Sequence, residues 1–197
     1  MMVFRALAPS VALMLAISGC SVFPPPSPPP ALHDLGPSGN RAEPTQATWS
    51  TVEVDAPQWL QDEHIRYRLL YADPTRVRLY ARDQWLAPPP SLLAQRLSLA
   101  GGGRGYRLHI RLLDFEQTFD GPKSARVILT FVAKAVTPET GQTAGQRVFQ
   151  LNRTASSADA AGAVAAFAAL VDEAVILIGA WVAEMPAYPE AEGTAGH

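Results

Sequence analysis

The stretch 106–112, Tyr-Arg-Leu-His-Ile-Arg-Leu, decides the fold, because its apolar and polar residues alternate with a period of two. This period places one set of side chains on each face of a β-strand. We therefore expect Leu108 and Ile110 to be buried and the polar residues between them to face water. Phe115 continues out of phase with this pattern, which predicts a β-bulge near 112–113.

Other strands are predicted on both sides of this stretch. Two more, at 126–136 and 147–154, follow turns rich in Gly and Pro, and with 106–112 they form an antiparallel meander. Upstream, 65–71 and 77–82 alternate in the same way around Asp73-Pro74-Thr75-Arg76, which suits a type I turn and predicts a hairpin. Shorter strands are expected at 51–54 and within 31–35.

Two segments have helical spacing instead. Residues 91–99 follow three prolines and precede a run of glycines, and a longer pattern begins at Ser156 or Ser157 and continues to 184. The sequence predicts an α+β domain with an antiparallel sheet of five or six strands and both helices packed on one face. Val171 and Val175 should be buried.

The second helix could also be interpreted as a membrane span, because it is long and apolar. Asp172 and Glu173 lie in its middle, where each charge would cost several kcal/mol in a bilayer, about 2.5–3.5 kcal/mol on insertion scales. A helix lying on a sheet can instead turn these carboxylates toward water. We therefore favour the packed helix over the span.

The N-terminus reads as a bacterial lipoprotein signal. Arg5 is the only charge before an apolar run at 11–17, and Leu-Ala-Ile-Ser-Gly-Cys at 15–20 resembles a lipobox. Cys20, the only cysteine in the chain, would become the first mature residue and carry acyl chains such as palmitate, which anchor a protein firmly when several are present. The alternative is an ordinary secretory signal followed by a cysteine.

Six prolines among residues 21–30 make a stiff tether of up to about 30 Å after this cysteine. Ser21 stands where an aspartate would favour retention in the inner membrane, so we expect an outer-membrane location, on the periplasmic face. The predicted organisation is signal peptide 1–19, acylated Cys20 and tether 20–31, folded domain 32–185, and disordered tail 186–197.

The composition of the chain narrows the classes of function that it can have. Removing 19 of 197 residues leaves 178, and losing Arg5 takes the net charge from −2 to −3, which suits one domain and gives no footprint for nucleic acid. The four histidines are scattered, and the glycines at 101–105 run from a helix into a strand, unlike a phosphate loop. We expect no enzyme activity, no metal site and no cofactor.

Arginines on the polar phase of the strands are more informative. They form either a solvated sheet face or a basic surface that meets an acidic partner or lipid head groups. These residues are Arg66, Arg68, Arg78, Arg82, Arg107 and Arg111.

Several motifs in order resemble the ABC-type transport auxiliary lipoproteins, the PqiC/YmbA-like family. A valine-rich strand at 52–54 precedes a Pro-x-x-Leu turn at 57–60 and a strand containing Tyr67-Arg68. The family's segment of a Tyr followed by Trp-x-x-Pro-Pro then resembles Tyr80, Trp85, Pro88 and Pro89, with four residues between Tyr80 and Trp85, although Leu86-Ala87 departs from the family's usual Ala-Glu. The resemblance covers residues 32–185.

This resemblance implies an auxiliary subunit of a lipid transport system with an MCE-domain protein and an ABC permease and ATPase as partners. Neither the tether nor a compact domain about 30 to 40 Å across can span the periplasm alone, so a bridging partner is needed. The candidate contact residues are Arg66, Arg68, Arg78, Trp59 and Trp85. Homo-oligomerisation, an envelope assembly factor or pilotin that binds a protein client, and a periplasmic hydrolase remain open.

Overall fold

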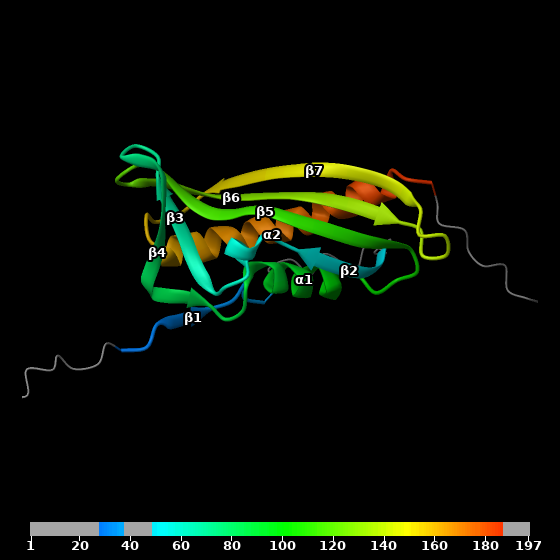
Figure 1. Ribbon diagram of the computed structural model, residues 1–197, viewed down its shortest axis with the longest axis horizontal. Helices are drawn as coiled ribbons and strands as arrows, with labels where there is room; N and C mark the ends of the chain where they lie inside the picture. Colours follow the sequence, from blue (N-terminus) through cyan, green and yellow to red (C-terminus); the bar gives the residue numbers. More distant parts are fainter. Residues whose placement is uncertain (1–27, 38–48, 187–197) are drawn as a thin grey trace, which may run out of the picture.

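The computed structural model describes residues 28–37 and 49–186. Seven strands form one sheet, and two helices pack against it (Figure 1), which confirms the predicted α+β fold. The signal peptide, Cys20, most of the tether and nearly all of the predicted tail lie outside the described residues. The elements are β1 (Ala31–His33), β2 (Trp49–Asp55), the short 3-10 helix η1 (Gln58–Leu60), β3 (His64–Leu69), β4 (Asp73–Trp85), α1 (Pro89–Ala100), β5 (Tyr106–Gly121), β6 (Ser124–Val136), β7 (Thr143–Thr154) and α2 (Ala160–Ala183).

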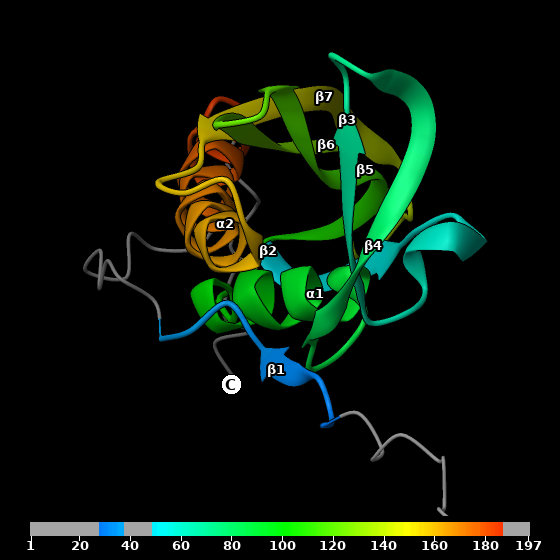
Figure 2. The ribbon, with the colours of Figure 1, turned by 90° about the vertical axis from the view of Figure 1, so that its left-hand side faces the viewer.

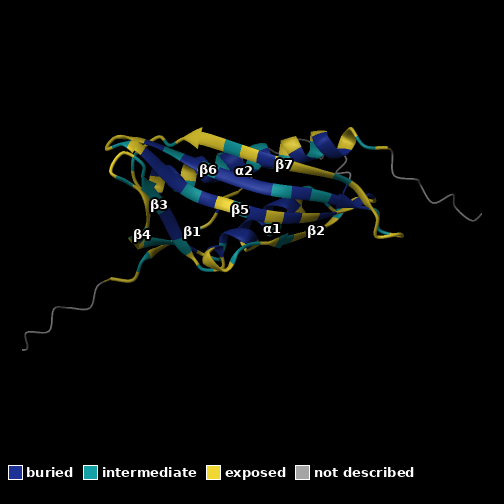
Figure 3. Cartoon of the chain, turned by 45° about the horizontal axis from the view of Figure 1, so that its top comes forward, coloured by how far each residue is buried: buried dark blue, intermediate teal, exposed yellow. Residues whose placement is uncertain are grey.

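The predicted meander is confirmed. β5, β6 and β7 pair antiparallel in sequence order, and the register shifts between Leu112 and Asp114, where the bulge was expected. Leu108 and Ile110 are buried as predicted. Figure 3 shows buried residues running along β6, whereas the outermost strand, β7, carries many exposed ones.

The sheet is mixed rather than wholly antiparallel, and it has seven strands rather than five or six. β1 pairs parallel with β4, while β2 and β3 both pair parallel with β5. With 16 residues, β5 is long enough to hold β2 along 106–111 and β3 along 117–119 on the same edge. A single long strand therefore accommodates two short neighbours that alternation alone cannot place.

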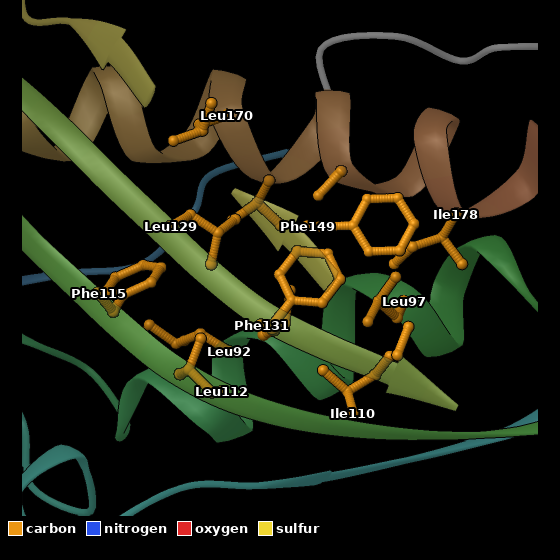
Figure 4. Packing of buried hydrophobic residues seen from close by; sticks show 14 of the residues in the cluster. Leu92, Leu97, Ile110, Leu112, Phe115, Leu129, Phe131, Phe149, Leu170 and Ile178 are labelled. Carbon is orange, nitrogen blue, oxygen red and sulfur yellow. The ribbon is translucent and has the colours of Figure 1, made fainter. Parts of the chain in front are cut away.

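The two helices enclose one hydrophobic core. Figure 4 shows side chains from α1, α2 and the meander meeting between the helices and the sheet. The rings of Phe115 and Phe167 stack with centroids 3.9 Å apart, and those of Phe131 and Phe149 lie 5.0 Å apart. Val171 is buried as predicted, whereas Val175 is only partly buried against this core.

Helix α2 starts slightly later than the sequence predicts. Asp159 is its N-cap and accepts a hydrogen bond from the Gly162 N–H at 2.8 Å, while the Ser157 hydroxyl donates to the same carboxylate at 2.6 Å. These two hydrogen bonds, with that of Ser157 the larger cause, hold the pKa of Asp159 below its ordinary value. The serine supports the cap and is not the cap itself.

Helix α2 is long and apolar enough to cross a membrane, with a mean hydropathy of 2.1. It nevertheless packs on β6 and β7 and contributes a row of fully buried residues to the core. Its two central carboxylates are partnered instead of simply facing water, because Asp172 contacts Arg96 and Glu173 contacts Arg153. The apolar composition of α2 is accounted for by this packing.

The domain is elongated, and its two ends differ. β1, β3 and β4 lie at one end, while the turn between β6 and β7 and the C-terminal end of α2 lie at the other (Figure 1). Figure 2 looks directly at the first end, where β4 crosses the molecule and β1 lies against it. The described chain therefore begins at the end that β4 occupies.

Candidate functional site

Two of the arginines predicted to form a basic surface are engaged in ion pairs. Arg66 is only 8% exposed, and its Nη2 lies 2.7 Å from Asp62 Oδ2. The Arg68 guanidinium donates two hydrogen bonds to the Glu116 carboxylate, from Nε at 3.1 Å and from Nη2 at 3.2 Å. The expectation that both face a partner is wrong for Arg66, because the fold buries its side chain.

The carboxylate of Asp62 is correspondingly stabilised as an anion. Partial burial alone would raise the pKa of Asp62, but the His64 N–H and the Arg66 guanidinium, both bonded to this carboxylate, hold the pKa below its ordinary value. The pair therefore remains charged over the physiological pH range and fixes the start of β3.

In the middle of β4, the polar residues of the alternating pattern, Arg78 and Tyr80, are partly buried. The Tyr80 ring packs 4.7 Å from that of Tyr67, and its hydroxyl donates to Gln117 Oε1 at 2.7 Å. Burial is the main reason that the pKa of Tyr80 is raised. Arg78 is half-buried on the same side, and its Nε has no hydrogen-bond partner within the described part of the chain.

As a consequence, the alternate residues of β4 turn outward. Val77 and Leu79 are both exposed, although their alternation with arginine is of the kind that usually marks a half-buried strand. Sequence reasoning missed these two residues as a surface feature. The signal was present in the alternation itself, but an alternating strand does not say which of its faces meets the core.

The two tryptophans proposed as contacts have opposite environments. Trp85 is 1% exposed and lies edge-on to the rings of Phe115 and Phe167, each with its centroid 5.7 Å away. The prediction that it is exposed is therefore wrong, because β4 ends by inserting this ring into the core. Trp59 is 63% exposed on η1, while its neighbour Leu60 is buried and holds the turn in place.

The N-terminal part of the described chain is fastened to β4. β1 aligns with Asp83–Trp85 in parallel, and the Leu86 N–H donates to the His33 carbonyl at 2.7 Å. His33 Nε2 lies 2.8 Å from Asp83 Oδ1. This strand immediately follows the proline tether in the sequence.

A second fastening involves Arg96 of α1, which sequence reasoning did not single out. Its Nη2 donates to the carbonyls of Leu35 at 2.6 Å and Gly36 at 2.7 Å, and its Nη1 lies 2.5 Å from Asp172 Oδ1. The arginine side chain is 6% exposed and the aspartate side chain 24%. We call this arrangement the Arg96 clamp, since one guanidinium joins α1, α2 and the N-terminal segment.

An open groove of about 520 Å³ lies on the face of the sheet away from the helices. Its carboxylates, Glu53 and Asp55, come from β2, and its cations, Arg111 and Lys134, come from β5 and β6. His109 Nδ1 lies 3.1 Å from Glu53 Oε2. The groove therefore brings carboxylates, an imidazole and two cations to one surface of the sheet.

Within residues 28–37 and 49–186, no three His, Cys, Asp or Glu side chains come close enough to hold a metal ion together. The described histidines lie apart, each beside a carboxylate: His33 with Asp83, His64 with Asp62, and His109 with Glu53.

A scan against protein-family models found no match for this chain, and no curated protein matches it. Solved structures do. A Xanthomonas campestris protein described under the family name DUF330 is 21% identical, with a TM-score of 0.62 over 79% of this chain and 93% of its own. An uncharacterised protein gives 14% identity and a TM-score of 0.61 over 79% and 99%.

A Caulobacter crescentus protein covers 48% of this chain and 83% of its own with 16% identity and a TM-score of 0.37, too weak for an argument. The first two likenesses establish that this chain shares the fold of the DUF330 protein over most of both chains.

Proposed function

We propose that this chain is an outer-membrane lipoprotein that acts as the docking or bridging subunit of an MCE-type ABC transport system moving lipids between the membranes. The observation that carries the proposal is the attachment of β1, the first strand after the tether, at one end of an elongated domain. The lipobox and the resemblance of residues 32–185 support it, and the shared fold with a DUF330 protein is consistent with it.

The dimensions explain why such a subunit would dock rather than carry lipid alone. The 16 residues of β5 have a contour length of about 50 Å at about 3.3 Å per residue. The tether adds up to about 30 Å. A domain held at its β1 end therefore leaves the rest of its surface free for a partner rooted in the inner membrane, and no enzymatic step is required of it.

The anchor is tested first. Cys20→Ala should leave the folded domain intact, because Cys20 precedes the domain predicted at 32–185, while abolishing acyl labelling and releasing the protein from the membrane fraction or leaving it unprocessed. Metabolic labelling with palmitate, together with membrane fractionation, measures this. Quantitative retention in the outer membrane with unchanged acyl label would refute the lipobox assignment.

The partner is tested by capture. The MCE-domain protein encoded in the same operon should be recovered with the wild-type chain, and Trp59→Ala should weaken that binding about 30-fold, the effect of losing about 2 kcal/mol at an aromatic hot spot. Trp59 suits this test because it is exposed and its loss opens no cavity.

Leu99→Ala is the matched control, since Leu99 is an exposed apolar residue on α1. Melting curves should show both variants folded. Equal recovery of wild type and Trp59→Ala would remove η1 from the interface. Failure of the wild type to bind would contradict the transport role itself.

A further inference from the structure

Exposed apolar side chains gather at the end of the domain where the described chain begins. Tyr71 lies at the turn between β3 and β4, and Val77 and Leu79 lie on β4 itself. Leu32 of β1, which aligns with Gln84, and Leu86, directly after β4, are exposed toward the other end of the same strand. Half of the large exposed hydrophobic residues within the described part of the chain therefore lie on or beside these two strands.

Positive charge lies along the same strand, at the positions that alternate with Val77 and Leu79. Arg76 and Arg82 are exposed on β4, and among the described residues neither has a carboxylate within ion-pair distance. Asp83, the next carboxylate along β4, lies 2.8 Å from His33 Nε2. We call Tyr71, Arg76, Val77, Leu79 and Arg82 the β4 strip.

The backbone of β4 adds to this surface. β3 occupies one edge of β4, but on the other edge β1 pairs only with Asp83–Trp85. Within the described residues, the rest of that edge, from Asp73 to Arg82, has no neighbouring strand. Its outward N–H groups can donate hydrogen bonds, and anionic oxygens are the acceptors that N–H groups and arginines share.

The tether fixes where this surface lies relative to the membrane. β1 holds the chain against the C-terminal end of β4, and Cys20 is eleven residues before Ala31. A polyproline tether of this length reaches at most about 30 Å, so the end of the domain shown in Figure 2 is the end that can come to the lipid surface. The opposite end of the molecule is farther away by the length of the sheet.

We infer that the β4 strip rests on an anionic glycerophospholipid surface, with its arginines at the head-group phosphates and its apolar side chains at the interface. This inference rests on the lipid anchoring of the proposed function but not on its transport partner. Arginine combined with exposed aliphatic and tyrosine side chains is the combination that interfacial surfaces use, since the guanidinium stays in water while the apolar groups leave it. An acidic protein would match the arginines but not the exposed Val77 and Leu79 beside them.

The experiment measures vesicle binding without acyl chains. The chain from residue 20 onward with Cys20→Ser retains every described residue, and it should sediment with vesicles containing phosphatidylglycerol, more weakly as salt rises. Arg76→Glu/Arg82→Glu should lower the partition coefficient at least 25-fold, because each arginine near an anionic surface contributes about fivefold. Val77→Ser/Leu79→Ser should lower it as well, since the aliphatic contribution is lost.

Arg107→Glu/Arg111→Glu is the control of equal charge change, because both residues are exposed on β5 away from β4. Its binding should fall much less. The inference is overturned if the Cys20→Ser chain does not bind anionic vesicles, if neutral phosphatidylcholine vesicles bind it equally well, or if the two double charge reversals have equal effects. Capture of the MCE protein is measured separately, so loss of vesicle binding and loss of the partner are distinguishable.

Discussion

Replacing Trp85 with alanine is expected to lower the free energy of unfolding by about 3 to 5 kcal/mol, the range for deleting a buried tryptophan. The ring is almost wholly buried, and it lies edge-on to both Phe115 and Phe167. Removing it would leave a cavity between β4, β5 and α2 that surrounding side chains can fill only in part. The melting temperature should fall by about 6 to 20 °C, at about 2 to 4 °C per kcal/mol.

Urea unfolding followed by circular dichroism measures the change. Trp59→Ala removes the same atoms from an exposed site and should change the free energy of unfolding by no more than about 0.5 kcal/mol. If the two variants proved equally stable, Trp85 would not lie in the core and the placement of β4 would be wrong.

Arg96→Met is expected to have an effect of similar size, about 3 to 5 kcal/mol, because it removes one partner of a buried ion pair. The Asp172 carboxylate would lose this guanidinium, and the carbonyls of Leu35 and Gly36 would each lose a donor. The methionine fills much of the space, so the loss is electrostatic rather than steric.

A double-mutant cycle separates these contributions. Arg96→Met/Asp172→Leu should recover part of the stability, since it replaces the whole pair with apolar groups. Full recovery is not expected, because the carbonyls of Leu35 and Gly36 remain unpaired. A loss below about 1 kcal/mol for Arg96→Met alone would contradict the clamp.

The local pattern of the central strands was sufficient to predict their structure. Leu108 and Ile110 alternate with charged residues, and the phase change at Phe115 correctly placed the bulge. The extents of both helices followed from their apolar spacing. These features depend on residues close in sequence, so one segment at a time determines them.

Features that depend on distant segments were not predicted. Nothing in residues 51–54 says that β2 lies parallel to β5, because that pairing is set by where the intervening chain crosses the sheet. The outward phase of Val77 and Leu79 likewise follows from the inward contacts of Tyr80 with Tyr67 and Gln117. Edge strands with two dissimilar faces have this ambiguity generally.

The residues predicted to contact a partner differ in whether the structure exposes them. Trp59 is exposed as supposed, whereas Trp85 is buried against rings from distant segments, and Arg66 is buried beside Asp62, only four residues before it. Arg96 could have been found, because it falls on the apolar stripe formed by Leu92, Leu93 and Leu97, where an unpaired charge would be costly.

The contacts of the N-terminal segment with β4 and Arg96 would also determine how far the domain can move from the proposed anchor at Cys20. Any pull from the membrane first reaches β1, which is held by only three paired positions, and then the carbonyls gripped by Arg96. While both sets of contacts hold, the chain between the proposed anchor and the domain is the eleven residues from Cys20 to Pro30. With both open, it would extend at least through residue 37, and at most about 3.5 Å per residue its contour would grow from roughly 40 to roughly 60 Å. With the proposed anchor at Cys20, Arg96 and β1 would act as a mechanical stop that limits the reach of the domain from the membrane.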